Sequence, residues 1–147
     1  MSEKSEKVAE FIELGAPEEK LAQVCLRTAI HYERGETVSI YTPDQGEAAE
    51  LDSRLWTFRQ NAFIPHVRLE EAEGPLIEPV VIFSAEPGDV ESDVLIVASA
   101  DGLPDWLTRF AHVYDFAAVY DAELRQASRA RYAACKGAGY RMRFIKP

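Results

Sequence analysis

Apolar residues in the first third of the chain recur at spacings that change from one stretch to the next. Residues 7–14 alternate well enough for a first strand or a short helical entry. Residues 17–34 have apolar positions at helical spacing, and their opening Pro-Glu-Glu is typical of a helix start. Residues 37–42 predict a strand, and residues 44–56 predict a second helix capped by Asp44. This βαβα order favours a parallel sheet covered by helices.

Proline and glycine interrupt the pattern between residues 57 and 79, so this segment is expected to be mostly loop. Continuous apolar runs then predict buried strands over 80–84 and 94–99. The remaining expected elements are, in order, a helix over 103–112, a strand over 113–120, a helix over 121–136 and a final strand over 140–145. We therefore predict one α/β domain over residues 1–147. Its three layers are a mostly parallel, Rossmann-like sheet with helices on both faces.

The composition indicates a chain that works in the cytoplasm. No run of about 18 apolar residues is present, so no membrane span is expected, and the polar N-terminus does not resemble a secretory signal. Cys25 and Cys135 lie far apart without a second pair of ligands nearby, which argues against both zinc and a disulfide framework. We expect both to be small, buried or half-buried thiols in a reducing compartment.

The charge is strongly asymmetric. Residues 1–124 hold nine basic residues against 25 acidic ones, a net charge of −16, whereas residues 125–147 hold seven basic residues and no acid, a net charge of +7. The overall charge of −9 argues against general affinity for nucleic acid. The C-terminal segment, in contrast, is expected to meet a negatively charged partner.

The signals of nucleotide binding and catalysis are missing. Neither a P-loop nor a Gly-x-Gly-x-x-Gly motif follows any expected strand, and Glu18 and Glu19 would repel a phosphate at the first helix. His31, His66 and His112 are scattered, without a metal-ligand spacing. We therefore predict no nucleotide-binding loop, catalytic residue, metal or cofactor. The alternative is a small α/β enzyme with a cleft at the carboxyl ends of the strands, which would use acids near Asp101 or Asp115.

The last predicted helix has a cationic face. Four of its side chains fall within an arc of roughly 60°: Arg125, Arg129, Tyr132 and Lys136. The opposite face is small and apolar and is expected to pack on the sheet: Leu124, Ala127, Ala130, Ala134 and Ala138. Guanidinium groups beside an aromatic ring suit an acidic peptide with an apolar end.

Two other interpretations of the cationic face remain open. It can be an ordinary solvated helix surface, although such surfaces usually mix both signs of charge. It can also bind single-stranded DNA directly, with Arg141 and Arg143 extending the basic strip. The −16 carried by the rest of the chain would repel a phosphate backbone, and this disfavours the DNA interpretation.

Large aromatic residues gather where the second helix ends. Trp56, Phe58 and Phe63 lie at this helix end and in the proline-containing loop that follows. Such residues commonly cap a core, but aromatic residues on loops are also frequent anchors of protein interfaces.

Several blocks of sequence together resemble one known family. In order they are Leu51-Asp-x-x-Leu-Trp56, Phe63-Ile-Pro-His66, Glu73-Gly-Pro75, Asp115-Phe116, Arg125-Gln-x-x-Arg129-x-Arg131-Tyr132 and Gly139-Tyr140. Their order and spacing, over most of residues 20–141, resemble the chi subunit of bacterial DNA polymerase III. The resemblance implies a Rossmann-like α/β fold without a nucleotide site and without catalysis.

The resemblance also implies partners in DNA replication. Chi subunits bind the acidic, Phe-ending C-terminal tail of the single-stranded-DNA-binding protein. They also pair with the psi subunit of the clamp loader, so their association with DNA is indirect. By position, the implied tail site is Arg125, Arg129, Tyr132 and Lys136, with Gly139 and Tyr140 beside it and Arg129 on the terminal carboxylate. Trp56 and Phe63 would face psi, on a surface that a DNA helicase can also meet.

Overall fold

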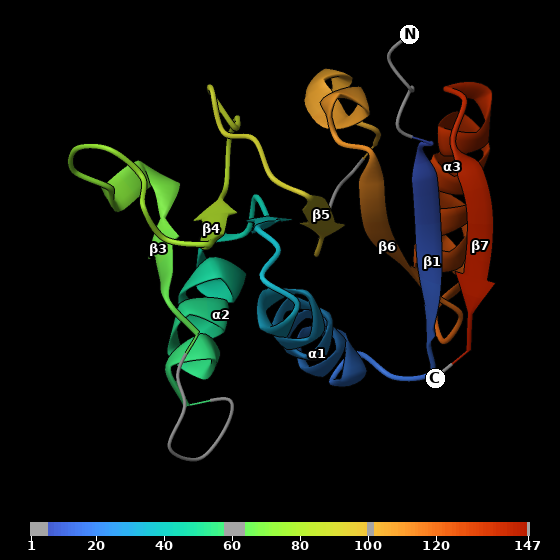
Figure 1. The fold of residues 1–147 in the computed structure, drawn as a ribbon. Helices are drawn as coiled ribbons and strands as arrows, with labels where there is room; N and C mark the ends of the chain where they lie inside the picture. Colours follow the sequence, from blue (N-terminus) through green and yellow to red (C-terminus); the bar gives the residue numbers. More distant parts are fainter. Residues whose placement is uncertain (1–5, 58–63, 100–101, 147) are drawn as a thin grey trace, which may run out of the picture.

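A seven-stranded sheet forms the centre of the molecule in the computed structural model, which describes residues 6–57, 64–99 and 102–146. Every strand pairing is parallel, in the order β3-β4-β2-β5-β6-β1-β7 (Figure 1). The strands are β1 (Val8–Leu14), β2 (Val38–Tyr41), β3 (His66–Arg68), β4 (Val80–Phe83), β5 (Val94–Val97), β6 (His112–Ala118) and β7 (Arg141–Ile145). The predicted α/β class is confirmed, and the first apolar stretch is a strand.

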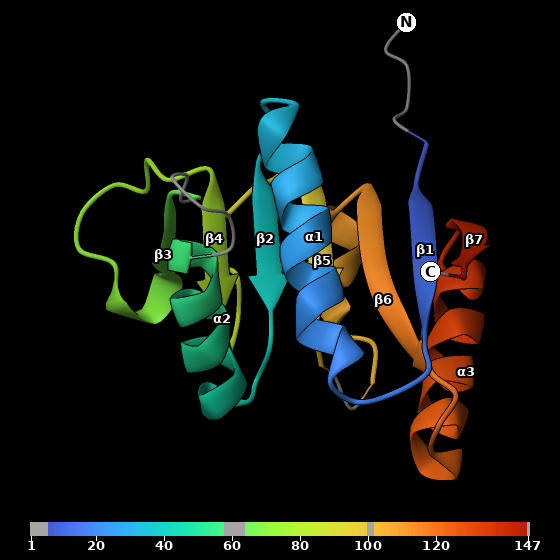
Figure 2. The same cartoon turned by 90° about the horizontal axis from the view of Figure 1, so that it is seen from below.

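Helices cover both faces of the sheet. Helices α1 (Glu19–Glu33) and α2 (Gln45–Thr57) lie on one face, and Figure 2 shows α1 in front of β5, with β2 beside it. Helix α3 (Ala122–Gly137) lies on the other face, behind β1 and β7 in Figure 1. The five-residue 3₁₀ helix η2 (Asp105–Arg109) covers the central strands on that same face.

Side chains alternate between two cores because successive residues of a strand point to opposite faces. In β1, Ile12 and Leu14 face the core under α1 and α2, whereas Ala9 and Phe11 face the core under α3 and η2. The central strands β4 and β5 are buried at every position, which explains their continuous apolar sequence. No helix within the described ranges is long and apolar enough to cross a bilayer.

Two sequence predictions for the middle of the chain were wrong in detail. The expected loop over 57–79 contains the edge strand β3 and a single 3₁₀ turn, η1 (Leu69–Glu71). Strand β3 pairs with one neighbour over three residues, too short for a periodic signal. The expected helix over 103–112 is the shorter 3₁₀ helix η2, and the last residue of that range, His112, already belongs to β6. Pro104 precedes η2 in extended conformation, which sets a late start.

The ends of the two later helices follow from local chemistry. Asp44 Oδ1 accepts the backbone N–H of Glu47 at 2.9 Å, and Asp121 Oδ2 accepts that of Leu124 at 2.9 Å. Gly139 has φ +97, a conformation that favours glycine, and it turns the chain from α3 into β7.

Candidate functional site

A buried ion pair fixes helix α3 against the sheet. Arg131 donates from Nε to Asp115 Oδ2 at 2.7 Å and from Nη2 to Oδ1 at 3.1 Å, which joins α3 to β6. The backbone N–H of Phe116 also donates to Asp115 Oδ1, at 2.7 Å. Burial raises the pKa of the Asp115 carboxyl, and the Arg131 guanidinium and the Phe116 N–H oppose that rise. One of the seven C-terminal cations is therefore neutralised inside the protein.

The side of α3 that packs is not the one the sequence predicted. Ser128 and Cys135 are the buried residues of the helix, and Ser128 Oγ donates to the carbonyl of Phe116 at 3.0 Å. The alanines that were expected on the sheet are exposed: Ala130, Ala134 and Ala138. The helix is rotated because Asp115 and the Phe116 carbonyl provide partners for Arg131 and Ser128, which a pattern of apolar residues cannot reveal.

A hollow of about 330 Å³ lies between α3 and strands β1 and β7. We call it the basic pocket; it is lined by Phe11, Ala117, Val119, Arg125, Ser128, Arg129, Tyr132 and Phe144. Three of the predicted tail-site residues, Arg125, Arg129 and Tyr132, therefore lie together. The lining combines aromatic and small apolar side chains with two guanidinium groups and no carboxylate.

The two arginines of the basic pocket differ in their partners. Arg125 Nη2 donates to the carbonyl of Val119 at 2.6 Å, which holds this guanidinium at the pocket wall. Arg129 is exposed, and among the described residues no carboxylate or carbonyl pairs with it. Tyr132 packs edge-on against Phe11, with ring centroids 5.2 Å apart. The pocket thus offers one held cation, one available cation and an aromatic wall.

The other predicted tail-site residues lie further along α3 and after it. Lys136 and Gly139 are exposed and do not line the basic pocket. Tyr140 is only 4% exposed. Its hydroxyl lies 2.6 Å from the carbonyl oxygen of Phe110 and 3.0 Å from that of Leu107, beneath η2. Burial, followed by the nearby Cys135, raises the pKa of Tyr140 to about 12. The structure gives Tyr140 a place in the core beside the pocket.

Phe144 is the main residue of the pocket that sequence reasoning missed. Strand β7 pairs with β1 so that Phe144 stands opposite Phe11, and its ring is 48% exposed. Alternation along β7 puts Arg141 and Arg143 on the other face of the sheet from Phe144. These two arginines therefore do not extend the basic strip of α3. The alternating sequence Arg-Met-Arg-Phe, treated as a strand, is enough to predict that Phe144 and the two arginines lie on opposite faces.

At the carboxyl ends of the central strands, where open α/β sheets hold their ligands, a hollow of about 290 Å³ is present, and the polar side chains at its edge pair with one another. Lys20 Nζ lies 2.6 Å from Glu47 Oε2 and 2.7 Å from Ser99 Oγ. Ser99 Oγ in turn donates to Glu47 Oε1 at 2.9 Å. Of the acids that the enzyme alternative needs, Asp115 is paired with Arg131, and Asp101 lies outside the described residues. This arrangement gives the enzyme alternative no support.

The aromatic surface at the end of α2 is partly described. Trp56 is 53% exposed, so it does not cap the core, and its ring lies against His66 with centroids 5.0 Å apart. His66 Nε2 lies 2.8 Å from Asp52 Oδ1, which connects α2 to β3. Phe63, the second residue predicted for this surface, lies outside the described residues.

Comparison with known proteins gives consistent matches. The family model described as "DNA polymerase III chi subunit, HolC" matches residues 7–143. The DNA polymerase III subunit chi of Pseudomonas aeruginosa is 32% identical over 125 residues, which cover 84% of each chain. That of Escherichia coli K12 is 30% identical over 120 residues, 81% of this chain and 80% of the relative.

Among solved structures, the chain is similar to the C-terminal domain of the DEAD-box protein Dbp5. The TM-score is 0.59 at 12% identity, over 97% of this chain and 91% of the other. A likeness at this identity concerns the fold alone.

Proposed function

The chain belongs to the DNA polymerase III chi subunit family of replication accessory subunits, and from this premise we propose that it is a non-catalytic adaptor in the cytoplasm. One side of it binds the acidic, Phe-ending C-terminal tail of the single-stranded-DNA-binding protein. Another side binds the psi subunit and thereby the clamp loader. Through these two contacts it associates with DNA indirectly.

The observation that carries the tail proposal is the composition of the basic pocket. A chain that ends in phenylalanine presents a ring and a carboxylate on the same residue. The pocket has aromatic walls, Phe11, Tyr132 and Phe144, beside the guanidinium groups of Arg125 and Arg129. An apolar hollow with cations at its edge matches both parts of such a ligand.

The residues predicted for the tail site have different parts in this proposal. Arg129, without an internal partner among the described residues, pairs with the terminal carboxylate. Arg125 adds positive charge from a fixed position on the carbonyl of Val119. Lys136 attracts acids upstream in the tail, because it is exposed about two helical turns beyond Arg129 along α3. Gly139 and Tyr140 support the end of the helix.

The psi contact is proposed for the aromatic surface that includes Trp56. A half-exposed indole beside the end of a helix is a typical anchor of a protein interface. Phe63 is included from its position in the sequence, and a DNA helicase is a second candidate partner of the same surface. Trp56 lies on the strand β3 side, and the basic pocket lies at the β7 edge, so both partners have room at once.

Titration calorimetry with a synthetic acidic peptide that ends in phenylalanine tests the tail proposal. We expect micromolar affinity, about −8 kcal/mol, which weakens with salt. Arg129→Ala is expected to cost about 1.5–3 kcal/mol of binding, because it removes a charge-assisted contact.

Arg143→Ala is the matched control, since it removes the same charge from the other face of β7 and should leave the affinity unchanged. Equal affinity for the peptide without its terminal phenylalanine would contradict the proposal. Tight binding of an oligonucleotide by the isolated chain would instead favour direct binding of single-stranded DNA.

A further inference from the structure

Another hollow, of about 450 Å³, lies at the amino ends of β2 and β4. These strands are near the β3 edge of the sheet, whereas the basic pocket lies at the β7 edge. We call it the acidic groove. Its lining comes from the starts of two strands and from the segments 76–79 and 89–92: Thr37, Val38, Ser39, Leu76, Ile77, Glu78, Pro79, Val81, Asp89, Val90, Glu91 and Ser92. All of these residues lie within the described ranges.

The groove has an apolar floor and an unusually exposed apolar rim. Val81 and Val90 are buried at 5% and 8% exposure and form the floor. Ile77 on the rim is 86% exposed, and Leu76 next to it is 37% exposed. An isoleucine this exposed, beside a hollow with an apolar floor, leaves contiguous apolar surface for a partner to cover.

The charged residues that line the groove are all acidic, and the one cation described beside its 89–92 segment is Arg109, which donates to the carbonyls of Gly88 at 2.9 Å and Val90 at 2.8 Å. Glu78, Asp89 and Glu91 line it, and the lining contains no lysine, arginine or histidine. Within the described part of the chain, none of these three carboxylates is paired with a cation. The only hydrogen bond of Glu78 to protein in those ranges is a long one, 3.3 Å from the backbone N–H of Ile77. Three unneutralised carboxylates around an apolar hollow attract a cationic ligand.

A polar group at the base of the groove also has no partner. Ser39 is fully buried, and its Oγ makes no hydrogen bond to any residue that the structure describes. Buried hydroxyl groups are nearly always hydrogen-bonded, and an unsatisfied one costs free energy. The hydroxyl is an observation independent of the acidic rim.

We propose that the acidic groove binds a basic segment of a partner protein, in which lysine or arginine residues flank an apolar side chain. The apolar side chain fills the hollow between Ile77 and Val81. The flanking cations pair with Glu78 on one side and with Asp89 and Glu91 on the other. The inference goes beyond the tail and psi contacts, and it does not depend on them.

Titration of the isotope-labelled full chain with acetyl-Lys-Leu-Lys-Leu-Lys-amide at low salt, followed by NMR, tests this inference. We expect saturable shifts of the amide signals of residues 38–39, 76–78 and 89–92. A peptide with serine in place of both leucines should bind more weakly, because it has no side chain for the hollow. Saturating amounts of the acidic, Phe-ending peptide should not change the affinity, whether or not the tail proposal holds.

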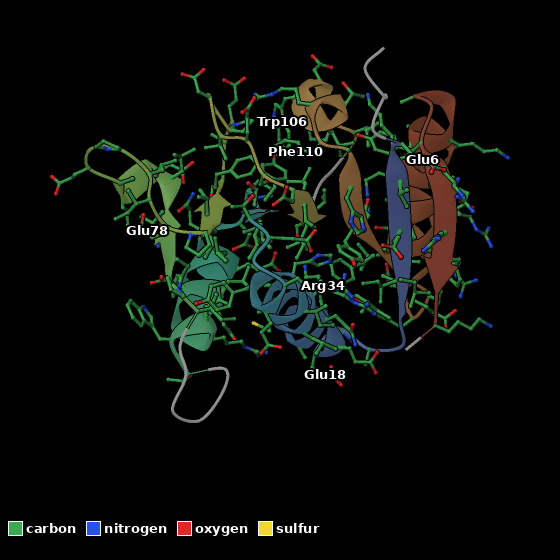
Figure 3. All side chains as sticks on the ribbon, in the orientation of Figure 1. Glu6, Glu18, Arg34, Glu78, Trp106 and Phe110 are labelled. Carbon is green, nitrogen blue, oxygen red and sulfur yellow. The ribbon has the colours of Figure 1, made fainter. Side chains whose placement is uncertain are left out.

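Two charge-reversal variants distinguish binding of the basic peptide at the groove from general attraction of the peptide to the acidic protein. Figure 3 labels Glu78 beside β3 and β4, and Glu18 at the start of α1, on separate parts of the molecule. Glu78→Lys should weaken binding about fivefold, since it replaces an attractive charge by a repulsive one. Glu18→Lys changes the net charge equally and should change the affinity by less than about twofold. Ile77→Ser should weaken binding about threefold, because the rim loses its apolar contact.

Three results would overturn the inference. The first is a set of shifts scattered over the acidic surface instead of the groove. The second is equal binding of the leucine and serine peptides, and the third is an equal effect of Glu18→Lys and Glu78→Lys. Each would show that the chain attracts cations only through its net charge.

Discussion

The basic pocket and the acidic groove are both apolar hollows with charges of one sign, but they are built differently. The pocket lies between a helix and two strands, with Phe11 and Phe144 in register on neighbouring strands. The groove takes much of its lining from the connecting segments 76–79 and 89–92. The pocket is therefore held in one geometry by backbone hydrogen bonds, whereas the shape of the groove depends on two loops. The first suits a ligand end of fixed shape, and the second suits a less strictly defined segment.

The two sites also differ in whether their charged residues pair with other residues of the protein. Arg131 on α3 is neutralised by Asp115, a buried carboxylate of β6, and only the exposed cations of the helix remain for a ligand. Around the groove no such internal pairing occurs among the described residues, so all three carboxylates remain without a cation. The contrast predicts that substitutions on α3 separate into structural and binding effects, whereas those at the groove affect binding alone.

The largest effect is expected from Arg131→Ala, which removes the ion pair that holds α3 and the basic pocket in place. It leaves the Asp115 carboxylate buried without its cation and should lower the free energy of unfolding by about 3–5 kcal/mol at pH 7. Urea denaturation measures the loss. Affinity for the acidic peptide should fall as well, because α3 loses its anchor.

The double variant Asp115→Asn with Arg131→Ala serves as its control. Without the buried charge, part of the lost stability should return. Arg129→Ala should leave the urea midpoint unchanged. A loss of stability with Arg129→Ala as large as with Arg131→Ala would contradict the division of α3 into a structural and a binding arginine.

Phe144→Ala tests whether the aromatic wall of the basic pocket contributes to ligand binding. It removes one aromatic wall of the basic pocket and should weaken binding of the Phe-ending peptide by about 1–2 kcal/mol. Binding of the basic peptide at the groove should not change. Calorimetry with both peptides on the same variant provides the measurement, and equal weakening of both would show that the two sites are not independent.

Tyr140→Phe tests whether a predicted site residue supports the pocket from the core. It removes the hydroxyl that faces the carbonyls of Phe110 and Leu107 and should cost about 1 kcal/mol of stability at neutral pH. Affinity for the tail peptide should stay within about twofold. A large loss of affinity without a loss of stability would instead indicate direct contact with the ligand.

The same variant has a pH signature. Burial raises the pKa of Tyr140 from 10.0 to about 12, so the folded state holds this proton to higher pH than the unfolded chain does. The resulting stabilisation is complete below pH 10 and is lost as the pH rises from 10 to about 12. Tyr140→Phe should therefore lose less stability across this range than the unmodified chain, as measured by urea denaturation at pH 7, 10 and 11. Equal losses in both proteins would contradict the assigned shift.

A small effect on stability is expected from Trp56→Ser. The indole is half-exposed, so the free energy of unfolding should change by only about 0.5 kcal/mol. Neither peptide should bind differently. Co-elution with the psi subunit in gel filtration should be lost, and its retention would argue against the surface that we propose for psi.

Much of the fold could be predicted because its strands carry strong local signals. Strands β4 and β5 are buried on both faces and are apolar throughout, so their sequences alone indicate them. Strand β3 could not be predicted, since three residues at a sheet edge give no period. Its place is fixed by β4 and by the contact of His66 with Asp52, which are not sequence neighbours.

The candidate site could be predicted only in part for a related reason. Helical spacing brought Arg125, Arg129 and Tyr132 together correctly, because this depends on the helix alone. Which side of the helix is buried depends on Asp115, a residue of another element. The contribution of Phe144 likewise depends on a strand pairing between the two ends of the chain.

This pairing has a consequence for biosynthesis. Phe11 and Phe144 lie on strands that are far apart in the sequence, and among the described strands β1 pairs only with β6 and β7, which are made after the other four. Strand β1 therefore cannot dock until these two strands have been synthesised. A prematurely terminated product that lacks β7 cannot complete the pocket, and incomplete copies would not compete with finished ones for the acidic ligand.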